Sequence, residues 1–485
     1  MPTNSDPLPG LGAWADESEP PPPPPAPKSR ELTAALAELE ARFADRYSAN
    51  ETIRQQHAHT LTWTANEPPD AVVFPQTTEE VAEIVKVCAA NRVPVIAFGT
   101  GTSLEGHVNA PLGGVCVDTS RMKRIIAVHA EDLDCVVDAG VTRKELNDHL
   151  RHSGLFFPID PGADASIGGM VSTRASGTNA VRYGTMKDNV LALTVVTASG
   201  EIMRTGSRAK KSSAGYDLTR LFIGAEGTLG VVTEITLRLH GLPESIVGGI
   251  CPFPSVKAAC DATILTIQSG IPVARIELLD ELAVRSVNLH SKLGLTETPM
   301  LLVEFHGTEA SAREQAEHFG DIAKELGGGP FAFAAKPEER TKLWQARHDA
   351  YWAGFTLRPG AKGLATDICV PISRLAECVT QTQDDMAESN LMGPIIGHVG
   401  DGNFHVNLLF DMNDADEVIR VEKFLERLVA RGLAMDGTCT GEHGVGQAKM
   451  KYMAMEHDPA ALAAMRAIKT ALDPAGIMNP GKLVG

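Results

Sequence analysis

The stretch AVVFPQTTEEVAEIVKVCAANRVPVIAFGTGTS, residues 71–103, decides the fold class of this chain. Residues 71–75 form a short apolar run that predicts a strand. Residues 78–91 follow a Thr-x-x-Glu capping pattern and repeat apolar residues at helical spacing, which predicts a helix. Residues 93–98 predict a second strand, and a glycine-rich turn follows it. A β-α-β unit that ends in such a turn therefore opens the main domain.

The rest of the chain predicts an α+β protein with a second domain. Short runs bounded by Gly, Asp or Ser predict further strands at 114–118, 125–128, 135–138, 192–198 and 231–239. This succession of strands favours α+β over a doubly wound parallel sheet. After Pro243, strand–helix passages at 248–268 and 301–326 predict a smaller sheet covered by helices. A further helix is predicted at 459–472.

The chain divides into five predicted segments. They are an acidic, proline-rich tail at 1–30, a helical lead-in at 31–66, the main domain at 67–242, a second domain at 243–434, and a C-terminal segment at 435–485 that returns to the main domain. Ten prolines in the first 27 residues predict a disordered or polyproline tail. The first basic residue is Lys28, so neither a signal peptide nor a mitochondrial presequence is expected. We expect a cytoplasmic protein, with peripheral attachment to the inner membrane as the alternative.

The composition argues against several classes of function. Lys and Arg number 44 against 61 Asp and Glu, a formal net charge of −17, whereas nucleic-acid binding needs basic patches. No apolar run approaches the roughly 18 residues that cross a bilayer. The eight cysteines include no Cys-x-x-Cys pair, which favours buried free thiols. Of the 45 glycines, 18 lie between Gly99 and Gly230, where the backbone is expected to approach a ligand closely.

Four loops of small residues are interleaved with the predicted strands of the main domain. They lie at 99–103, 160–169, 177–184 and 226–230. Taken alone, the first loop is either a tight structural turn or a Rossmann turn with Asp118 as the ribose-binding acid. The Rossmann interpretation fails because Leu104 occupies the place of the third glycine. One such loop is a turn, but four together predict a channel for a long cofactor.

Two histidines and a glutamate form a candidate metal site. His398 and His405 flank a Gly-Asp-Gly-Asn turn, so strands on either side would bring both imidazoles to one point. Glu442 lies in a later glycine-rich loop and completes a three-ligand set with an open position for substrate. Neighbouring side chains on an extended segment point to opposite sides. We therefore assign Glu442 to the metal and His443 to acid–base chemistry, and the reverse assignment stays open.

The order of the four loops resembles the flavin-binding domain of the vanillyl-alcohol oxidase, or PCMH-type, family over residues 67–242, and the motif Tyr216–Phe222 continues the match. The resemblance implies a two-part FAD-binding domain. It also implies non-covalent FAD, because the positions that carry an attachment histidine in some relatives hold Thr and Ser here, and His107 lies beyond the turn. The residues that it implies for FAD binding are Gly99, Thr100, Gly101, Thr102, Ser103, Gly162, Ala163, Ser166, Gly169, Gly177, Asn179, Gly227 and Val231.

The C-terminal half resembles the FAD-linked D-2-hydroxyacid dehydrogenases, most closely their D-lactate dehydrogenase branch, which uses cytochrome or another acceptor. The motifs that carry this resemblance are Cys439–Gly444 and Met478–Lys482. It implies a ferredoxin-like substrate domain that caps the flavin. The roles that it implies are zinc or manganese binding by His398, His405 and Glu442, proton abstraction by His443, substrate binding by Arg347 and Asn407, and FAD binding by Asn479.

The resemblance implies oxidation of a D-2-hydroxyacid, with proton abstraction from the 2-hydroxyl and hydride transfer to flavin N5. Relatives that act on 2-hydroxyglutarate carry a lysine shortly before the strand at 367–371. Ala365 and Thr366 stand there in this chain, which favours D-lactate as substrate and pyruvate as product. Lys362 and Asn407 keep a D-2-hydroxyglutarate dehydrogenase open, and a glycolate oxidase flavoprotein subunit is a further alternative. From other classes, the alternatives are a metal-dependent hydrolase and a binding protein with an inactive centre. The expected partners are a quinone, a cytochrome or an electron-transfer flavoprotein as electron acceptor, and a second copy in a homodimer.

Overall fold

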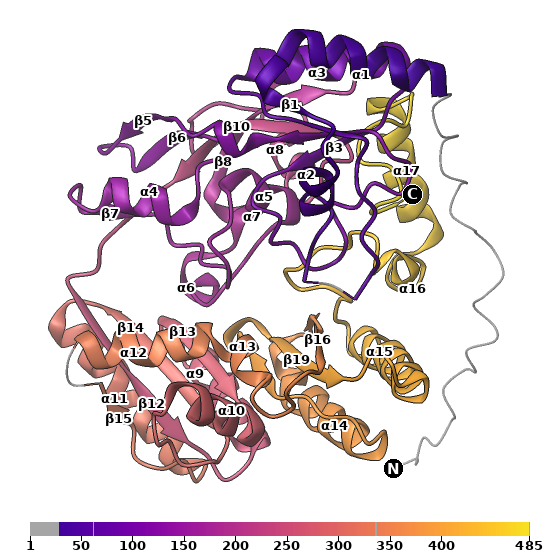
Figure 1. The fold of residues 1–485 in the computed structure, drawn as a ribbon. Coiled ribbons are helices and arrows are strands. Elements are labelled where there is room, and N and C mark those ends of the chain that lie inside the picture. Colours follow the sequence, from indigo (N-terminus) through magenta and orange to yellow (C-terminus); the bar gives the residue numbers. More distant parts are fainter. Residues whose placement is uncertain (1–28, 62, 335–336, 485) are drawn as a thin grey trace.

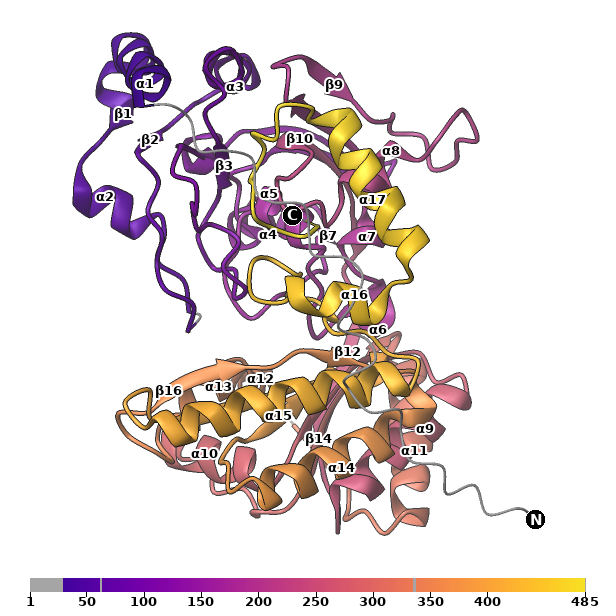
Figure 2. The same ribbon diagram turned by 90° about the vertical axis from the view of Figure 1, so that its right-hand side faces the viewer.

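The computed structural model describes residues 29–61, 63–334 and 337–484, so the predicted tail lies outside the described residues except for its last two positions. The chain folds into an upper lobe and a lower lobe (Figure 1). The upper lobe contains the N-terminal half of the chain and, in yellow, the C-terminal segment. The lower lobe contains the residues between them, and Figure 2 shows the same division from the side. The mixture of helices and strands confirms the α+β class.

The opening β-α-β unit forms one side of the upper lobe, as predicted. Strand β4 is parallel to both of its neighbours, β2 and β3. The strand order is β1 (Tyr47–Ser48), β2 (Ala71–Val73), β4 (Val115–Asp118), β3 (Val95–Phe98). Helix α3 (Thr78–Asn91) begins where the Thr77 hydroxyl accepts a hydrogen bond from the Glu80 amide. Its apolar face is buried in the core that it shares with this sheet and helix α1 (Ser29–Phe43).

An antiparallel sheet forms the rest of the upper lobe. Its strand order is β5 (Ile125–His129), β6 (Asp134–Asp138), β10 (Gly230–Arg238), β8 (Val190–Thr197), β9 (Ile202–Arg204). The connecting elements are α2 (Glu51–Gln56), α4 (Arg143–Leu150), β7 (Leu155–Phe156), α5 (Ile167–Thr173), α6 (Ala180–Tyr183), α7 (Met186–Asn189), α8 (Leu218–Phe222) and β11 (His240–Gly241). Helix α3 also packs against β8, so the two upper sheets share one covering helix. The antiparallel pairing confirms that the lobe is not a doubly wound parallel sheet.

The lower lobe is built on one antiparallel sheet. Its strand order is β15 (Ala332–Phe333), β12 (Ser245–Pro252), β14 (Met300–Gly307), β13 (Val273–Leu279), β18 (Ile395–Gly397), β19 (Asn403–Phe410), β16 (Lys362–Ala365), with β17 (Ile368–Cys369) also paired to β19. The first part follows the β-α-β-β-α-β ferredoxin-like pattern, with α9 (Val256–Gln268) and α11 (Glu309–Glu325) as its crossover helices. The prediction of a smaller sheet is wrong, because the β18–β19 hairpin and β16 extend this sheet beyond either sheet of the upper lobe.

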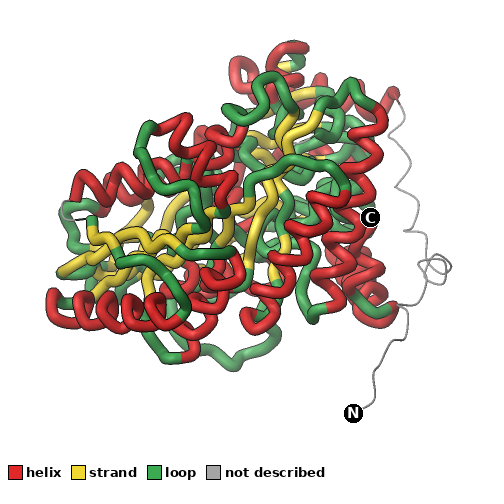
Figure 3. The backbone as a smooth tube through the Cα atoms, turned by 90° about the horizontal axis from the view of Figure 1, so that it is seen from below, coloured by secondary structure: helices red, strands yellow, loops and turns green. Residues whose placement is uncertain are grey.

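Helices cover both faces of the lower sheet, and Figure 3 shows them in red against the yellow strands. The helices that share the core on one face are α9, α11, α14 (Leu375–Glu388) and α15 (Ala415–Ala434). The helices on the other face are α10 (Glu281–Ser291), α12 (Pro337–His348) and α13 (Ala350–Gly354). Helix α15 was not predicted, although Val421, Phe424 and Leu428 recur at helical spacing and are buried.

The C-terminal segment returns to the upper lobe, as its yellow trace shows (Figures 1 and 2). It contains α16 (Met453–Glu456) and α17 (Pro459–Leu472), and the predicted helix at 459–472 is confirmed. Asp458 caps α17, and proline occupies its first turn. After α17 the backbone runs beside β3, where the Asn479 amide donates a hydrogen bond to the Val95 carbonyl at 2.9 Å. This hydrogen bond connects the C-terminal end of the chain to β3, the strand that precedes the first glycine loop.

Two expectations from composition agree with the structure. All eight cysteines belong to the described residues and are free; seven of them are buried, whereas Cys369 is partly exposed. Within the described ranges, no helix combines the length and the apolar character that a membrane span needs.

Candidate active site

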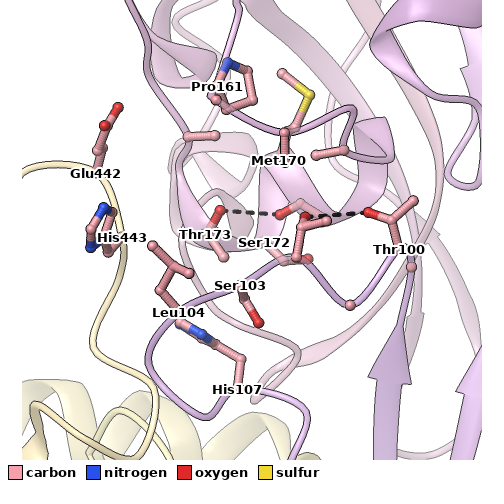
Figure 4. Close-up of a pocket in the computed structure, with 18 of the residues that line it drawn as sticks. Thr100, Ser103, Leu104, His107, Pro161, Met170, Ser172, Thr173, Glu442 and His443 are labelled. Atoms are coloured by element: carbon pink, nitrogen blue, oxygen red, sulfur yellow. Dashed lines mark hydrogen bonds between the residues drawn. The ribbon is translucent and has the colours of Figure 1, made fainter. Parts of the chain in front are cut away.

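A cavity of about 520 Å³ lies between the upper and lower lobes. Loops of the upper lobe contribute small residues to its wall, and the lower lobe contributes histidines and Arg347. Figure 4 shows Thr100 on one side of this space and the Glu442 and His443 side chains on the other. The predicted residues that line the cavity are Gly99, Thr100, Gly101, Thr102, Ser103, Gly162, Ala163, Gly169, Gly227, Val231, Arg347, His398, His405, Asn407, Glu442, His443 and Asn479.

The first glycine loop follows β3 directly and depends on one glycine. Gly101 has φ +66°, and a Cβ atom there would lie 2.7 Å from the Phe98 ring. A side chain at this position would be strained and would also collide, so the turn requires glycine. The Thr100 hydroxyl accepts a hydrogen bond from the Ser166 amide at 3.3 Å, which ties the first loop to the second.

Buried polar atoms around the cavity fit a large polar cofactor. Within the described part of the chain, Ser103 Oγ, both ring nitrogens of His107 and Asn479 Oδ1 are buried without a hydrogen-bond partner. His107 Nε2 lies 3.4 Å from the Glu226 carboxylate, but it is not aligned for a hydrogen bond. A Cβ atom on Gly162 would meet nothing within 4 Å, so the second loop faces open space. Because unpaired buried polar groups are costly, these atoms fit the long polar cofactor that the loops predict and that the family resemblance implies to be FAD.

Ser166, Gly177 and Asn179 were also predicted to bind FAD, but they are not among the described residues that line the cavity. The Ser166 hydroxyl caps helix α5. Gly177 packs against the Asp160 backbone at a φ of +139°. The Asn179 side-chain oxygen, Oδ1, accepts a hydrogen bond from Arg275 Nε of the lower lobe at 2.7 Å. In the structure these residues shape the loops behind the cavity wall.

A strand reversal brings the two metal-site histidines together, as the turn between them predicts. Strand β18 pairs antiparallel with β19, with Ile396 opposite His405, and His398 follows β18 directly. Nε2 of His398 and Nε2 of His405 lie 3.1 Å and 3.4 Å from Oε1 of Glu442. One ligand atom from each residue lies within 4.8 Å of the others. Glu442 Oε2 is buried and has no hydrogen-bond partner among the described residues. This N, N, O set fits a divalent cation such as zinc or manganese.

Burial and charge together set the protonation of this group. Burial raises the pKa of the Glu442 carboxyl, but His398 and His405 outweigh burial and hold that pKa below its ordinary value. Burial lowers the pKa of His398, but Glu277 and Glu442 outweigh burial and hold it well above its ordinary value. The Glu442 carboxylate is therefore ionised. A cation bound at this group would replace the proton on the His398 ring nitrogen that faces the Glu442 carboxylate.

His443 stands beside the three-ligand group. Its ring stacks on that of His405, with centroids 5.1 Å apart and planes 9° apart. Its Nδ1 lies 3.3 Å from Oε1 of Glu105. Burial lowers the pKa of His443, but Asp367 and Glu105 outweigh burial and raise it above the ordinary value. The neutral imidazole is therefore a stronger base than a free histidine.

Two buried carboxylates hold the loop that carries Glu442 and His443, residues 441–446. Asp367 Oδ2 accepts the amide hydrogens of Glu442 and His443, each at 2.9 Å. From the upper lobe, Glu226 accepts the amides of residues 445–446 at 2.7 and 2.8 Å. A second trio, Asp367 with His405 and His443, also brings its ligand atoms within 4.8 Å. Its Asp367 is occupied by backbone amides, which favours Glu442 as the metal ligand.

Arg347 lies near the end of α12 and reaches the cavity from the lower lobe. Its Nε donates a hydrogen bond to Glu277 Oε2 at 2.9 Å, and Nη2 lies 2.6 Å from the same oxygen. Asn407 follows His405 by two positions on β19, which places both side chains on one face. Its Nδ2 is buried and unpaired within the described ranges. Arg347 and Asn407 thus offer N–H groups to a ligand.

The carboxylates that support the site were not predicted from the sequence. Glu105, Glu226 and Glu277 are all buried and all contact a candidate site residue or its loop. Glu277 could have been recognised from the sequence, because it is the only acid in the mainly apolar strand Val273–Leu279, and a buried acid needs a partner. Glu105 carried no such signal, since an acid in a polar loop is ordinary. Further residues that line the cavity without having been predicted include His107, His348, Tyr351 and Trp352.

The fold and the cavity together define a class of protein, the FAD-dependent oxidoreductases with a PCMH-type flavin domain. The family described as FAD binding domain matches residues 69–206, and the family described as FAD linked oxidases, C-terminal domain, matches residues 242–483. The chain therefore belongs to the FAD-linked oxidase family.

Curated relatives match most of the chain. The probable mitochondrial D-lactate dehydrogenase of Danio rerio is 51% identical over 440 residues, which cover 90% of this chain and 88% of the relative. The mitochondrial D-lactate dehydrogenase (cytochrome) of Arabidopsis thaliana is 51% identical over 416 residues, 86% of this chain and 73% of the relative. The glycolate oxidase subunit GlcD of Bacillus subtilis is 34% identical over 419 residues, 86% and 89% of the two chains.

A solved structure supports the fold. p-Cresol methylhydroxylase with substrate bound superposes with a TM-score of 0.80 at 18% identity, covering 95% of this chain and 98% of that chain. At this identity the likeness concerns the fold alone, and it confirms the PCMH-type architecture.

Proposed function

We propose that this protein oxidises D-lactate to pyruvate, using non-covalent FAD and a divalent cation, Zn²⁺ or Mn²⁺. The observation that carries the proposal is a convergence at one end of the cavity. The three-ligand group of His398, His405 and Glu442 lies there beside His443, with Arg347 on the same cavity wall. The names of the fish and plant relatives support the choice of substrate.

When bound, FAD supplies the hydride acceptor, and the cation supplies a Lewis acid that lowers the pKa of the substrate hydroxyl. His443 receives the hydroxyl proton. Its stack on His405 and its contact with Glu105 hold the ring in one orientation. The raised pKa of His443 makes proton transfer to it favourable once the ring is neutral.

Arg347 orients the substrate through its carboxylate. A guanidinium suits a planar carboxylate because paired N–H groups meet paired oxygens. Glu277 accepts the Nε hydrogen, which leaves the Nη groups for the substrate, and the Asn407 amide on the same cavity lining is also unpaired within the described residues. With the carboxylate held by Arg347 and the hydroxyl directed at His443, one face of C2 meets the flavin. This positioning is the source of the preference for the D enantiomer.

The charges of the cavity favour a monocarboxylate. Among the described residues that line it, Arg347 is the only arginine or lysine. Ala365 lines the cavity, whereas Lys362, three positions earlier on β16, does not. Positions three apart on a strand face opposite sides, so Lys362 points away from the substrate. The described part of the cavity lining therefore offers no second arginine or lysine to the distal carboxylate of 2-hydroxyglutarate.

Anaerobic reduction of the bound flavin tests the proposal. D-Lactate, L-lactate, glycolate and D-2-hydroxyglutarate are mixed separately with the purified protein, and the loss of flavin absorbance is followed. D-Lactate should reduce the flavin fastest, at a rate at least about tenfold above that of D-2-hydroxyglutarate. A tenfold ratio corresponds to about 1.4 kcal/mol, which we assign to the unpaired distal carboxylate of D-2-hydroxyglutarate. Faster bleaching by D-2-hydroxyglutarate or by glycolate would assign the protein to that substrate instead.

Several further expectations stay as proposals. We propose the domain divisions at 31–66, 67–242, 243–434 and 435–485, an external electron acceptor (a quinone, a cytochrome or an electron-transfer flavoprotein), a homodimer and a cytoplasmic location. The metal-dependent hydrolase has no support, because both matching families are FAD-linked.

A further inference from the structure

Glu277 is a fully buried carboxylate that contacts two residues of the site at once. It lies on strand β13, where its side chain has no solvent exposure. Oε1 lies 2.8 Å from Nδ1 of His398. Oε2 accepts a hydrogen bond from Arg347 Nε at 2.9 Å and lies 2.6 Å from Nη2. The metal-site histidine and the substrate arginine are therefore joined through a single side chain.

The contact with His398 decides which ring nitrogen faces the cation. Oε2 of Glu277 already accepts the Nε hydrogen of Arg347, and Oε1 lies 2.8 Å from the His398 ring, so the Glu277 carboxylate acts as the acceptor toward both partners. Nδ1 of His398 therefore donates the hydrogen in this contact, which leaves the Nε2 lone pair to bind a cation. His405 reaches the same arrangement by another route, because its Nδ1 faces the Thr366 carbonyl at 2.8 Å. Both histidines consequently direct Nε2 at Glu442.

The contact with Arg347 fixes the guanidinium. A free arginine side chain has many rotamers, and ordering them costs free energy each time a ligand binds. The hydrogen bond from Arg347 Nε to Glu277, with Nη2 2.6 Å from the same oxygen, sets the plane of the guanidinium before substrate arrives. Because both partners are held by oxygens of the same rigid carboxylate, the separation between the cation site and the carboxylate-binding edge is set as well.

We propose that Glu277 is a positioning residue that couples the cation site to the substrate-carboxylate site. By holding His398 and Arg347, Glu277 fixes the distance between the two sites, and this distance suits an acid that carries its hydroxyl and carboxylate on adjacent carbons. The inference rests on the proposed function, since it concerns the ligands named there. It adds a residue that touches neither cation nor substrate and acts through His398 and Arg347.

The test uses the flavin-loaded protein, stripped of metal, as wild type and as E277Q. Gln keeps the size of the side chain but loses the charge and turns one acceptor into a donor that opposes Arg347. Mn²⁺ alone is titrated, with free Mn²⁺ followed by electron paramagnetic resonance. Steady-state kinetics with D-lactate are then measured at saturating Mn²⁺. We expect Mn²⁺ affinity to fall by about 10- to 100-fold. KM for D-lactate should rise at least about tenfold while kcat stays within several-fold of wild type.

A matched control separates positioning from a general loss of packing. Glu304 is a buried acid on the neighbouring strand β14, paired with His306 and Trp344. E304Q should keep wild-type Mn²⁺ affinity. If E277Q does not fold, E277D, which keeps the charge but withdraws it by one methylene, should weaken Mn²⁺ binding and raise KM in the same way.

The outcomes are distinct. Unchanged Mn²⁺ affinity in a folded Glu277 variant, or a loss of Mn²⁺ affinity with an unchanged KM, would overturn the coupling while leaving the proposed function intact. Wild-type protein that neither binds Mn²⁺ nor is reduced by D-lactate would overturn the proposed function, and the coupling with it.

Discussion

At the scale of single residues, the site is a set of imidazoles each held by an oxygen partner. His443 contacts Glu105, His405 contacts the Thr366 carbonyl, and His398 lies between two carboxylates. Such partners fix both the orientation and the tautomer of a ring. The chemistry assigned to each histidine therefore depends on a neighbour that is remote in sequence.

Replacing His443 tests its proposed role as the base. H443A should retain flavin, because the ring lies at the metal end of the cavity, and its reduction by D-lactate should slow by about 10²- to 10⁴-fold. Stopped-flow absorbance measures both the flavin content and the rate. H290A, at an exposed position on α10, is the control and should match wild type. Rapid reduction of H443A would remove this residue from the proton-transfer step.

Asp280 gives a pH-dependent prediction about stability. It caps α10, and burial raises the pKa of its carboxyl to about 7. Ionising this group in the folded protein therefore costs stability, and the cost grows as pH rises from about 4 through 7. D280N can still accept the capping hydrogen bond but carries no charge. Its melting temperature relative to wild type should rise by several degrees more at pH 8 than at pH 5. An equal difference at both pH values would refute this assignment.

At the scale of elements, the important unit is the 441–446 loop between its two carboxylates. E226Q leaves one acceptor oxygen and replaces the other with a donor, so the amide contacts to residues 445–446 are weakened. A hydrogen bond to a charged group contributes about 1.5–3 kcal/mol, so exchange of these amides should accelerate about 10- to 100-fold. Flavin reduction by D-lactate should slow as His443 loses its fixed position. Hydrogen–deuterium exchange reports the first effect, with E234Q on β10 as control. Unchanged exchange would show that Glu226 does not hold the loop.

Elements with complete local signals could be predicted from the sequence. Helix α3 carries its Thr77 cap, and α17 begins with Asp458 and proline, so both were predicted with the observed bounds. The proximity of His398 and His405 could be predicted because both residues belong to one hairpin with a glycine-rich turn. The pairing of Glu277 with His398 spans 121 residues and depends on strand order in the lower sheet, which no local pattern encodes. The extent of that sheet was missed for the same reason.

At the scale of the whole molecule, Arg275 joins the lobes. From β13 of the lower lobe, its guanidinium donates to Asn179, which lies behind the cavity wall, and lies 3.3 Å from Asp160, which lines the cavity. R275M leaves the Asp160 carboxylate without this partner, and loss of a buried pair costs about 3–5 kcal/mol. The melting temperature should fall by several degrees, and FAD should dissociate more readily in filtration assays. R285M, at an exposed arginine of the same lobe, should melt within about 1 °C of wild type. A wild-type melting profile for R275M would contradict this role.

The central claim is that the flavin loops of the upper lobe and the cation group, formed by two lower-lobe histidines and Glu442 of the C-terminal segment, make a single active site for D-lactate. The most direct measurement is anaerobic flavin reduction by D-lactate in protein that retains FAD but has been stripped of metal by a chelator. We predict slow or absent bleaching, restored to the untreated rate by Mn²⁺ or Zn²⁺, with the flavin content unchanged throughout. Bleaching at the full rate in the metal-free protein would contradict the account.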